Sequence, residues 1–111
     1  MAGDLTLGEA LRQQENSDRH IAAICAAPTS LLAHKVGFGK SITSYPAMKD
    51  QLVKDYKYVD DQLVVQDGNF ITSRGPGTAY LFALKIVEVL VGLEQAKTVA
   101  KALLNTPYPV A

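Results

Sequence analysis

The chain has 111 residues, of which 48% are hydrophobic and 20% charged, a balance typical of one globular domain. Eleven basic and eleven acidic residues cancel, so no surplus charge favours nucleic acid or an anionic membrane as a partner. No apolar run approaches the roughly 20 residues of a membrane span, and no secretory signal pattern is visible. The single cysteine excludes an internal disulfide and a thiolate-rich zinc site. We expect an intracellular, cytoplasmic protein, with a nuclear or mitochondrial location left open.

The first third of the chain predicts a helix, a strand and a second helix. Thr6 and Glu9 have the spacing of a capping box, which indicates the start of a helix. Residues 20–24 form a short, continuously apolar run, typical of a parallel strand covered on both faces. Pro28 then occupies a favoured first position of a helix.

The middle of the chain predicts several short strands. One pair is expected to flank a turn at residues 60–61, and a second tight turn at Asp67 and Gly68 precedes the last strand. The candidate strands are residues 41–44, 56–59, 62–66 and 69–72.

Two helices are expected at residues 78–91 and 94–104, followed by a flexible tail at 105–111. Strands that alternate with helices indicate a parallel sheet between helical layers. The predicted order nevertheless opens on a helix with no strand before it. We therefore expect that part of the fold is missing upstream of this helix.

Cys25 follows the apolar run and stands three residues before Pro28. This strand–turn–helix placement predicts a nucleophile elbow, in which a tight turn presents the side chain above the sheet. Amides at the helix start would stabilise a thiolate, and those of Ala26 and Ala27 are placed to bind an oxyanion. The alternative is a buried structural cysteine, and position alone gives the two readings about equal weight.

Other polar residues give weaker signals. Arg74 lies in a Gly/Pro-rich loop and is predicted to bind an anion or a carbonyl oxygen, with a surface salt bridge as the alternative. His34 is expected to be a cation at the end of a helix. Because one cysteine and two separated histidines make a poor ligand set, we predict no metal and no cofactor.

The segment around Cys25, residues 21–29, resembles the nucleophile segment of the DJ-1/PfpI superfamily, which includes the Parkinsonism-associated protein deglycases. The similarity extends over about residues 11–104. Further similar segments follow in the family's order, at residues 31–34, 37–39, 72–78 and 82–88.

The resemblance implies an α/β fold, a flavodoxin-like three-layer sandwich of the DJ-1/PfpI type that here lacks its N-terminal strands, and a homodimer. It also implies that residues 1–104 are the C-terminal part of a single domain of this type. It implies an oxidative-stress response through a readily oxidised cysteine, chaperone activity, and deglycase or glyoxalase chemistry on methylglyoxal adducts. The substrate would be a small aldehyde or a glycated protein. Carried over, Cys25 is the nucleophile, the Ala26 amide belongs to the oxyanion region, and Tyr45, Arg74 and Pro76 line the pocket.

Two parts of the family pattern have no counterpart in this sequence: an acid/base glutamate on an N-terminal loop and a Gly-Gly oxyanion loop. Tyr45 also stands where many relatives have a histidine, and a phenol is a poor base near neutral pH. Whether the chain is an enzyme is therefore left open. The alternatives are a non-enzymatic sensor or chaperone, which needs only an oxidisable thiolate, and an inactive fragment.

Overall fold

The computed structural model describes residues 3–104 and 108–109. The helices are α1 (Leu5–Asn16), α2 (Pro28–Ala33), α3 (Lys49–Leu52), α4 (Ala79–Val91) and α5 (Leu93–Ala102), with short 3-10 turns η1 (Pro46–Met48) and η2 (Pro76–Thr78). The strands are β1 (Ile21–Ile24), β2 (Ser41–Ile42), β3 (Lys57–Tyr58), β4 (Val64–Asp67) and β5 (Phe70–Ser73).

The described strands form two sheets. In the larger sheet the order is β1-β5-β4, with β1 parallel to β5 and β4 antiparallel to β5. The second sheet pairs β2 with β3 in parallel. The expected pairing of residues 56–59 with 62–66 is therefore wrong. The second predicted turn, at Asp67 and Gly68, does join β4 to β5, with a φ of 59° at Gly68, whereas β3 pairs with β2.

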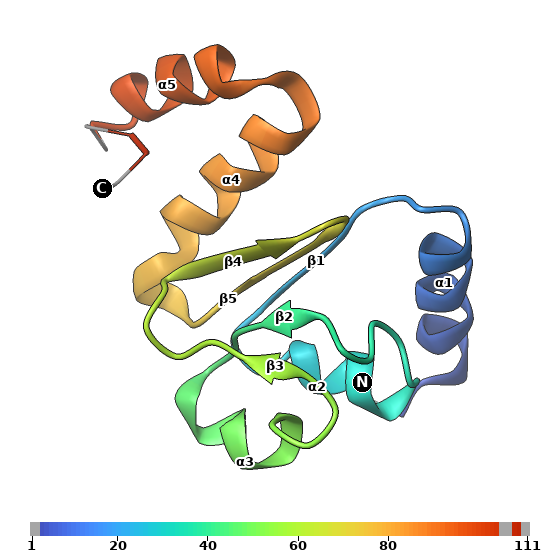
Figure 1. Ribbon diagram of the computed structural model, residues 1–111. Coiled ribbons are helices and arrows are strands. Elements are labelled where there is room, and N and C mark those ends of the chain that lie inside the picture. Colours follow the sequence, from blue (N-terminus) through green and yellow to red (C-terminus); the bar gives the residue numbers. More distant parts are fainter. Residues whose placement is uncertain (1–2, 105–107, 110–111) are drawn as a thin grey trace.

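The elements form layers around the larger sheet. Figure 1 shows α4 and α5 on one side, and β2, β3, α2 and α3 on the other. Each side has its own cluster of buried side chains. One comprises Ile21, Leu31, Val36, Ile42, Leu52, Tyr56 and Phe70, and the other Leu84, Ala96, Ala100 and Tyr108. The α/β layering predicted from the alternation of helices and strands is confirmed.

Helix α1 begins with a cap that differs from the predicted one. Asp4, not Thr6, is the N-cap residue, and its Oδ1 accepts a hydrogen bond of 3.0 Å from the Leu7 amide. A carboxylate is favoured at this position because it also meets the positive end of the helix dipole. The predicted capping box starts two residues too late.

The Leu7 hydrogen bond lowers the pKa of Asp4 from its ordinary value of 3.8. The stabilisation by the ionised cap is thus present above the unfolded-state pKa and is lost as the pH falls through the lower folded value. We expect Asp4→Asn, which keeps the acceptor, to lose part of the acid dependence of the melting temperature between about pH 5 and pH 2. Asp4→Ala should be less stable than Asp4→Asn at neutral pH. Equal melting temperatures for these two variants would contradict the cap.

Two residues of the predicted flexible tail, Tyr108 and Pro109, belong to the described part of the chain. Tyr108 is buried in the cluster beneath α4 and α5, and its hydroxyl donates to Glu88 Oε1 at 2.9 Å. Burial and this hydrogen bond raise the pKa of Tyr108. At this residue the chain is anchored. Residues 105–107 and 110–111, on which the same expectation falls, lie outside the described part.

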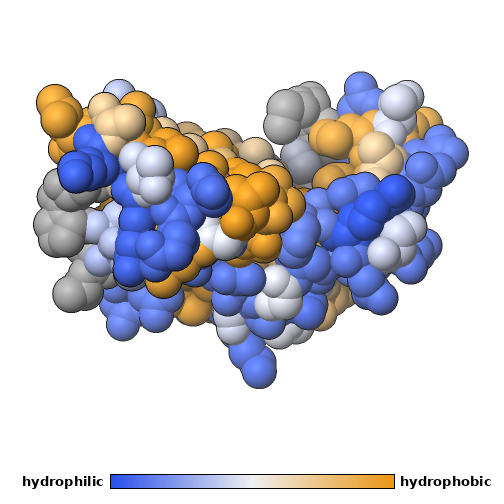
Figure 2. Space-filling model, turned by 90° about the horizontal axis from the view of Figure 1, so that it is seen from above, coloured by the Kyte–Doolittle hydropathy of each residue, from blue (hydrophilic) through white to orange (hydrophobic). Residues whose placement is uncertain are grey.

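The face that carries α4 and α5 has exposed hydrophobic side chains among polar ones, as Figure 2 shows. Helix α4 contributes Leu90 and Val91, which are 61% and 63% exposed. The outer edge of β1 has no strand beside it within the described residues. None of the described helices has the length and hydrophobicity that crossing a membrane requires.

Candidate active site at Cys25

Cys25 stands at the turn between β1 and α2 in the conformation of an elbow. Its φ is 64°, in the left-handed region, which costs a residue with a Cβ about 1–2 kcal/mol. The turn is held by hydrogen bonds on both sides, from the Cys25 amide to the Ser73 carbonyl at 3.1 Å and from the Ala27 amide to the Ile24 carbonyl at 3.1 Å. Pro28 begins α2 as expected. The thiol is free and partly exposed, so it is accessible at the end of the sheet.

The Ala27 hydrogen bond changes one expectation about the oxyanion region. Because the Ala27 amide already donates to Ile24, it is not available to an oxyanion. The neighbouring Ala26 is exposed, and its amide has no acceptor among the described residues. Of the two predicted donors, Ala26 is the one left open.

The structure brings Tyr45 to the elbow through its backbone. The Tyr45 amide donates to the Cys25 carbonyl at 2.7 Å. The ring is 46% exposed and lies beside Gly75, where an added Cβ would be 3.7 Å from its Cδ1. Tyr45 therefore joins two of the segments that the sequence assigned to one pocket.

Arg74 binds the protein's own backbone. Its Nε donates to the Ser44 carbonyl at 3.1 Å, and its Nη1 donates to the Asp60 carbonyl at 2.7 Å. The predicted binding of a carbonyl oxygen describes these contacts, although both carbonyls belong to the protein itself, and the alternative, a surface salt bridge, does not. The carboxylate of Asp60 pairs with Lys49 at 2.7 Å, a contact that lowers the pKa of Asp60. Arg74 connects the end of β5 with two loops.

Pro76 lies further from the chemistry. It is exposed and opens the 3-10 turn η2, and no described hydrogen bond links its segment to Cys25. The loop before it is closed by Thr78, whose Oγ1 accepts from the amides of Arg74 and Gly75 at 3.2 and 3.1 Å. The structure thus groups Cys25, Ala26, Tyr45 and Arg74, with Pro76 at the margin.

A set of hydroxyl groups behind the elbow was missed in the sequence. Ser44 Oγ lies 2.8 Å from the Tyr58 hydroxyl, which also donates to the Ser44 carbonyl at 3.3 Å. Ser73 Oγ donates to the Leu63 carbonyl at 2.6 Å and lies 2.7 Å from Thr78 Oγ1. The available signal was the pair of polar endings, Thr-Ser, after two apolar strand segments.

Comparison with known proteins identifies the family. The model of the DJ-1/PfpI family matches residues 1–89. The chain belongs to this family. It is 64% identical over 98 residues to Protein dj-1beta of Drosophila melanogaster, which covers 88% of this chain and 52% of that protein. It is 47% identical over 98 residues to the glutathione-independent glyoxalase DJR-1.2 of Caenorhabditis elegans, covering 87% of this chain and 52% of that protein.

The solved structures agree. The crystal structure of Drosophila melanogaster DJ-1beta superposes with a TM-score of 0.92 and 61% identity, over 96% of this chain and 57% of that chain. The flavodoxin-like α/β fold of the DJ-1/PfpI type, inferred from the segments around Cys25, is thereby confirmed. The chain spans about half the length of the curated relatives it matches.

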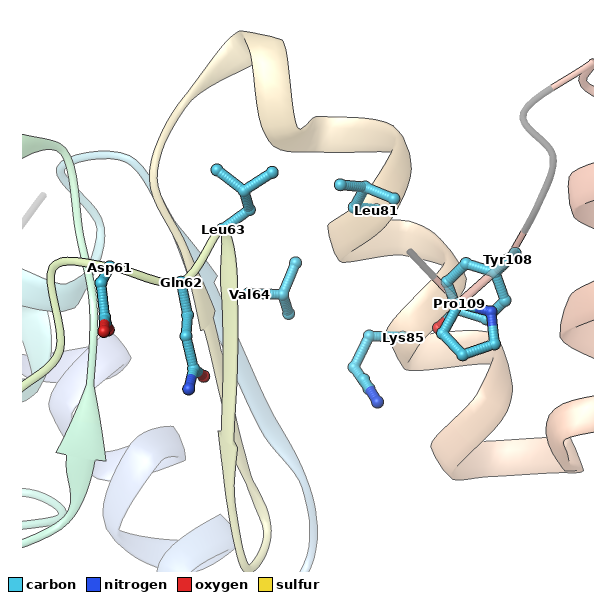
Figure 3. A pocket seen from close by; sticks show the side chains of 8 residues that line it. All are labelled: Asp61, Gln62, Leu63, Val64, Leu81, Lys85, Tyr108 and Pro109. Atoms are coloured by element: carbon cyan, nitrogen blue, oxygen red, sulfur yellow. The ribbon is translucent and has the colours of Figure 1, made fainter. Parts of the chain in front are cut away.

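Two hollows of this DJ-1/PfpI chain lie away from the elbow. One, of about 460 Å³, lies between the start of β4 and α4; Figure 3 shows Leu63 and Val64 on one side of it and Leu81 and Lys85 on the other. The other, of about 540 Å³, is lined by Ala22 and Ile71 of the sheet and residues of α1 and α4. Neither includes a predicted site residue. The geometry at Cys25, rather than a cavity, defines the candidate site.

The described residues hold no group of three or more His, Cys, Asp or Glu side chains that is suited to a metal ion. His34 does stand at the C-terminus of α2, as predicted, but it is only 9% exposed and packs against Gly8 of α1. The His34 ring packs α1 against α2, and among the described residues it makes no hydrogen bond with Cys25.

Proposed function

We propose that Cys25 is the nucleophile of a glyoxalase-type reaction, independent of glutathione, on small 2-oxoaldehydes such as methylglyoxal. The observation that carries this proposal is the strained elbow, which holds a partly exposed thiol between β1 and α2. Strain of this kind persists at sites where the surrounding structure over-determines it and function uses it. The 47% identity to a protein named as a glutathione-independent glyoxalase supports the same chemistry.

In the first step the Cys25 thiolate attacks the aldehyde carbon. A C–S bond forms while the π electrons of the carbonyl move to oxygen, and protonation gives a hemithioacetal. The developing oxyanion is the natural acceptor for the open Ala26 amide. The proton on the hemithioacetal carbon then moves to the neighbouring ketone carbon by way of an enediol, while the hydroxyl proton moves to the ketone oxygen, and a thioester results. Water attacks the thioester carbonyl, which releases a hydroxy acid and restores the thiol.

The later proton transfers need an acid/base group. Among the described residues no carboxylate is hydrogen-bonded to Cys25, and the phenol of Tyr45 is a poor base near neutral pH. We therefore expect this chain by itself to form the hemithioacetal readily and to complete turnover slowly.

The test is addition of methylglyoxal without glutathione. We expect the wild-type chain to gain the mass of one methylglyoxal and to consume it measurably, and Cys25→Ser to reduce both by at least about 100-fold, because a serine hydroxyl is far less ionised than a thiol. Intact-mass spectrometry and a spectrophotometric aldehyde assay provide the readouts, with circular dichroism as the folding control. Equal consumption by Cys25→Ser would overturn the proposal.

A second candidate is an oxidative-stress sensor, favoured by the one free and partly exposed thiol. It needs no acid/base residue. Stepwise oxidation of Cys25 by peroxide, in a chain that forms no methylglyoxal adduct, would favour the sensor over the enzyme. Deglycase and chaperone activity, and the homodimer that the family resemblance implies, remain proposals of the same kind.

A further inference from the structure

The peptide group between Ser44 and Tyr45 is bonded on both of its sides. Its carbonyl accepts from Arg74 Nε at 3.1 Å and from the Tyr58 hydroxyl at 3.3 Å. Its amide donates to the Cys25 carbonyl at 2.7 Å. In a trans peptide the C=O and N–H point in opposite directions, so a donor that fixes the carbonyl also fixes the amide. Arg74 is thus connected to Cys25 through this single peptide plane.

The Cys25 carbonyl that receives this hydrogen bond belongs to the peptide group whose amide is that of Ala26. By the same geometry, the Ala26 amide points away from Tyr45. It has no acceptor among the described residues, and Ala26 is exposed. Two peptide groups in series therefore lead from the guanidinium of Arg74 to an open N–H beside the thiol.

We propose that Arg74 is a positioning residue, which orients and polarises the Ala26 amide through these two peptide groups. Hydrogen bonds in a chain strengthen one another by about 10–30% each, and a charged donor at the start adds to this effect. The inference rests on the proposed function, because it assigns the polarised amide to the oxyanion of the Cys25 adduct. Arg74 itself does not touch the substrate.

An arginine suits this role because its planar fork donates in two directions. While Nε holds the Ser44 carbonyl, Nη1 holds the Asp60 carbonyl at 2.7 Å, which fixes the plane of the guanidinium. The backbone of Arg74 is held as well, by Thr78 Oγ1 at 3.2 Å. A lysine at this position keeps the charge but cannot reproduce the two-directional contact.

The experiment compares Arg74→Lys and Arg74→Met with Arg12→Met, an exposed position on α1. Amide exchange at Tyr45 and the amide proton shift of Ala26 are followed by NMR in the whole chain. The rates of methylglyoxal addition and of iodoacetamide alkylation at Cys25 are measured in parallel. Alkylation displaces iodide and develops no oxyanion, so a residue that acts on the oxyanion donor affects only the first rate.

We expect both Arg74 variants to speed exchange at Tyr45 about tenfold and to move the Ala26 amide proton upfield. Addition of methylglyoxal should slow about tenfold, less than the 10²–10³-fold typical of removing an oxyanion donor, while alkylation stays within about twofold. Arg12→Met should change none of these. Tyr58→Phe, which removes the weaker donor to Ser44, should act in the same direction and less strongly.

Unchanged amides at Tyr45 and Ala26 would overturn the inference, as would full recovery of both in Arg74→Lys, which would leave only an effect of charge. Equal slowing of both reactions would also overturn it, since that is the result of a merely structural role. If the wild-type chain forms no methylglyoxal adduct, the proposed function fails, and the two amide readouts still decide whether the connection from Arg74 exists.

Discussion

Replacement of Gly8 by alanine is expected to destabilise the fold by about 1–3 kcal/mol, although alanine is the better helix former. Gly8 is buried in α1, directly against the imidazole of His34 at the end of α2. A Cβ at this position would lie 2.8 Å from His34 Cγ and closer still to Nδ1 and Cε1. The ring is only 9% exposed and has little room to move, so the overlap must be relieved by separating the two helices. Chemical denaturation measures the loss.

The matched control is Gly77→Ala. A Cβ on Gly77 meets nothing within 4 Å and its backbone is not left-handed, so its substitution should change stability by less than about 0.5 kcal/mol. In a His34→Ala background, Gly8→Ala should lose most of its cost, because the added methyl group then has space. If Gly8→Ala proved as stable as the wild type, the close packing of α1 on α2 would be refuted.

Local signals in the sequence predicted the elements that build the elbow. The continuous apolar run at 20–24 and the helix-initiating Pro28 depend on neighbouring residues alone, and they placed β1, Cys25 and α2 correctly. The resemblance of the segments around Cys25 and at residues 72–78 to the DJ-1/PfpI family predicted the type of fold. These are the parts of a structure that nearest neighbours along the chain determine.

The errors concern partners distant in sequence or choices between similar local signals. The strand at 57–58 was recognised, but its partner is β2, which precedes it in the chain across η1 and α3, and not the strand that follows the next turn. Asp4 and Thr6 are both good caps, and only the path of the chain selects one. The acceptors of Arg74 are carbonyls 30 and 14 residues away, which no local pattern specifies.

The functional site itself combines both kinds of information. The position of Cys25 between a strand and a helix predicted both the thiol and the Ala26 amide as site groups. The hydrogen bonds from Tyr45 to Cys25 and from Arg74 to Ser44 form only because the loops after β2 and β5 lie together. The sequence analysis placed the side chains of Tyr45 and Arg74 in the pocket. In the structure Tyr45 contacts Cys25 through its own backbone amide, and the Arg74 side chain binds the carbonyl of Ser44, the residue before Tyr45. The positive φ of Cys25 agrees with the predicted elbow, but the residue type gives no local sign of it, because a residue with a Cβ rarely adopts this conformation.

Glycine at position 25 is expected to give a more stable protein than alanine at the same position, by about 1 kcal/mol. Both substitutions remove the thiol and abolish the chemistry, so they differ mainly in the Cβ. At φ 64° that atom crowds the following carbonyl, and glycine avoids the crowding. For a domain of this size the difference corresponds to about 4 °C or more in melting temperature, which calorimetry resolves.

In the control substitution, glycine is expected to lower the stability relative to alanine. Ala83 lies on the exposed side of α4 in the middle of the helix, where Ala83→Gly should destabilise by about 1 kcal/mol. If Cys25→Ala were as stable as Cys25→Gly, residue 25 would not hold the left-handed conformation in solution, and the elbow would lose its main physical support. If Cys25→Gly is the more stable variant, the fold retains a residue with a Cβ at a position where glycine has the lower backbone energy. On the function proposed for Cys25, such a cost persists because the reaction needs a thiol at the end of β1, held by Ser73 and Tyr45 from two other segments of the chain.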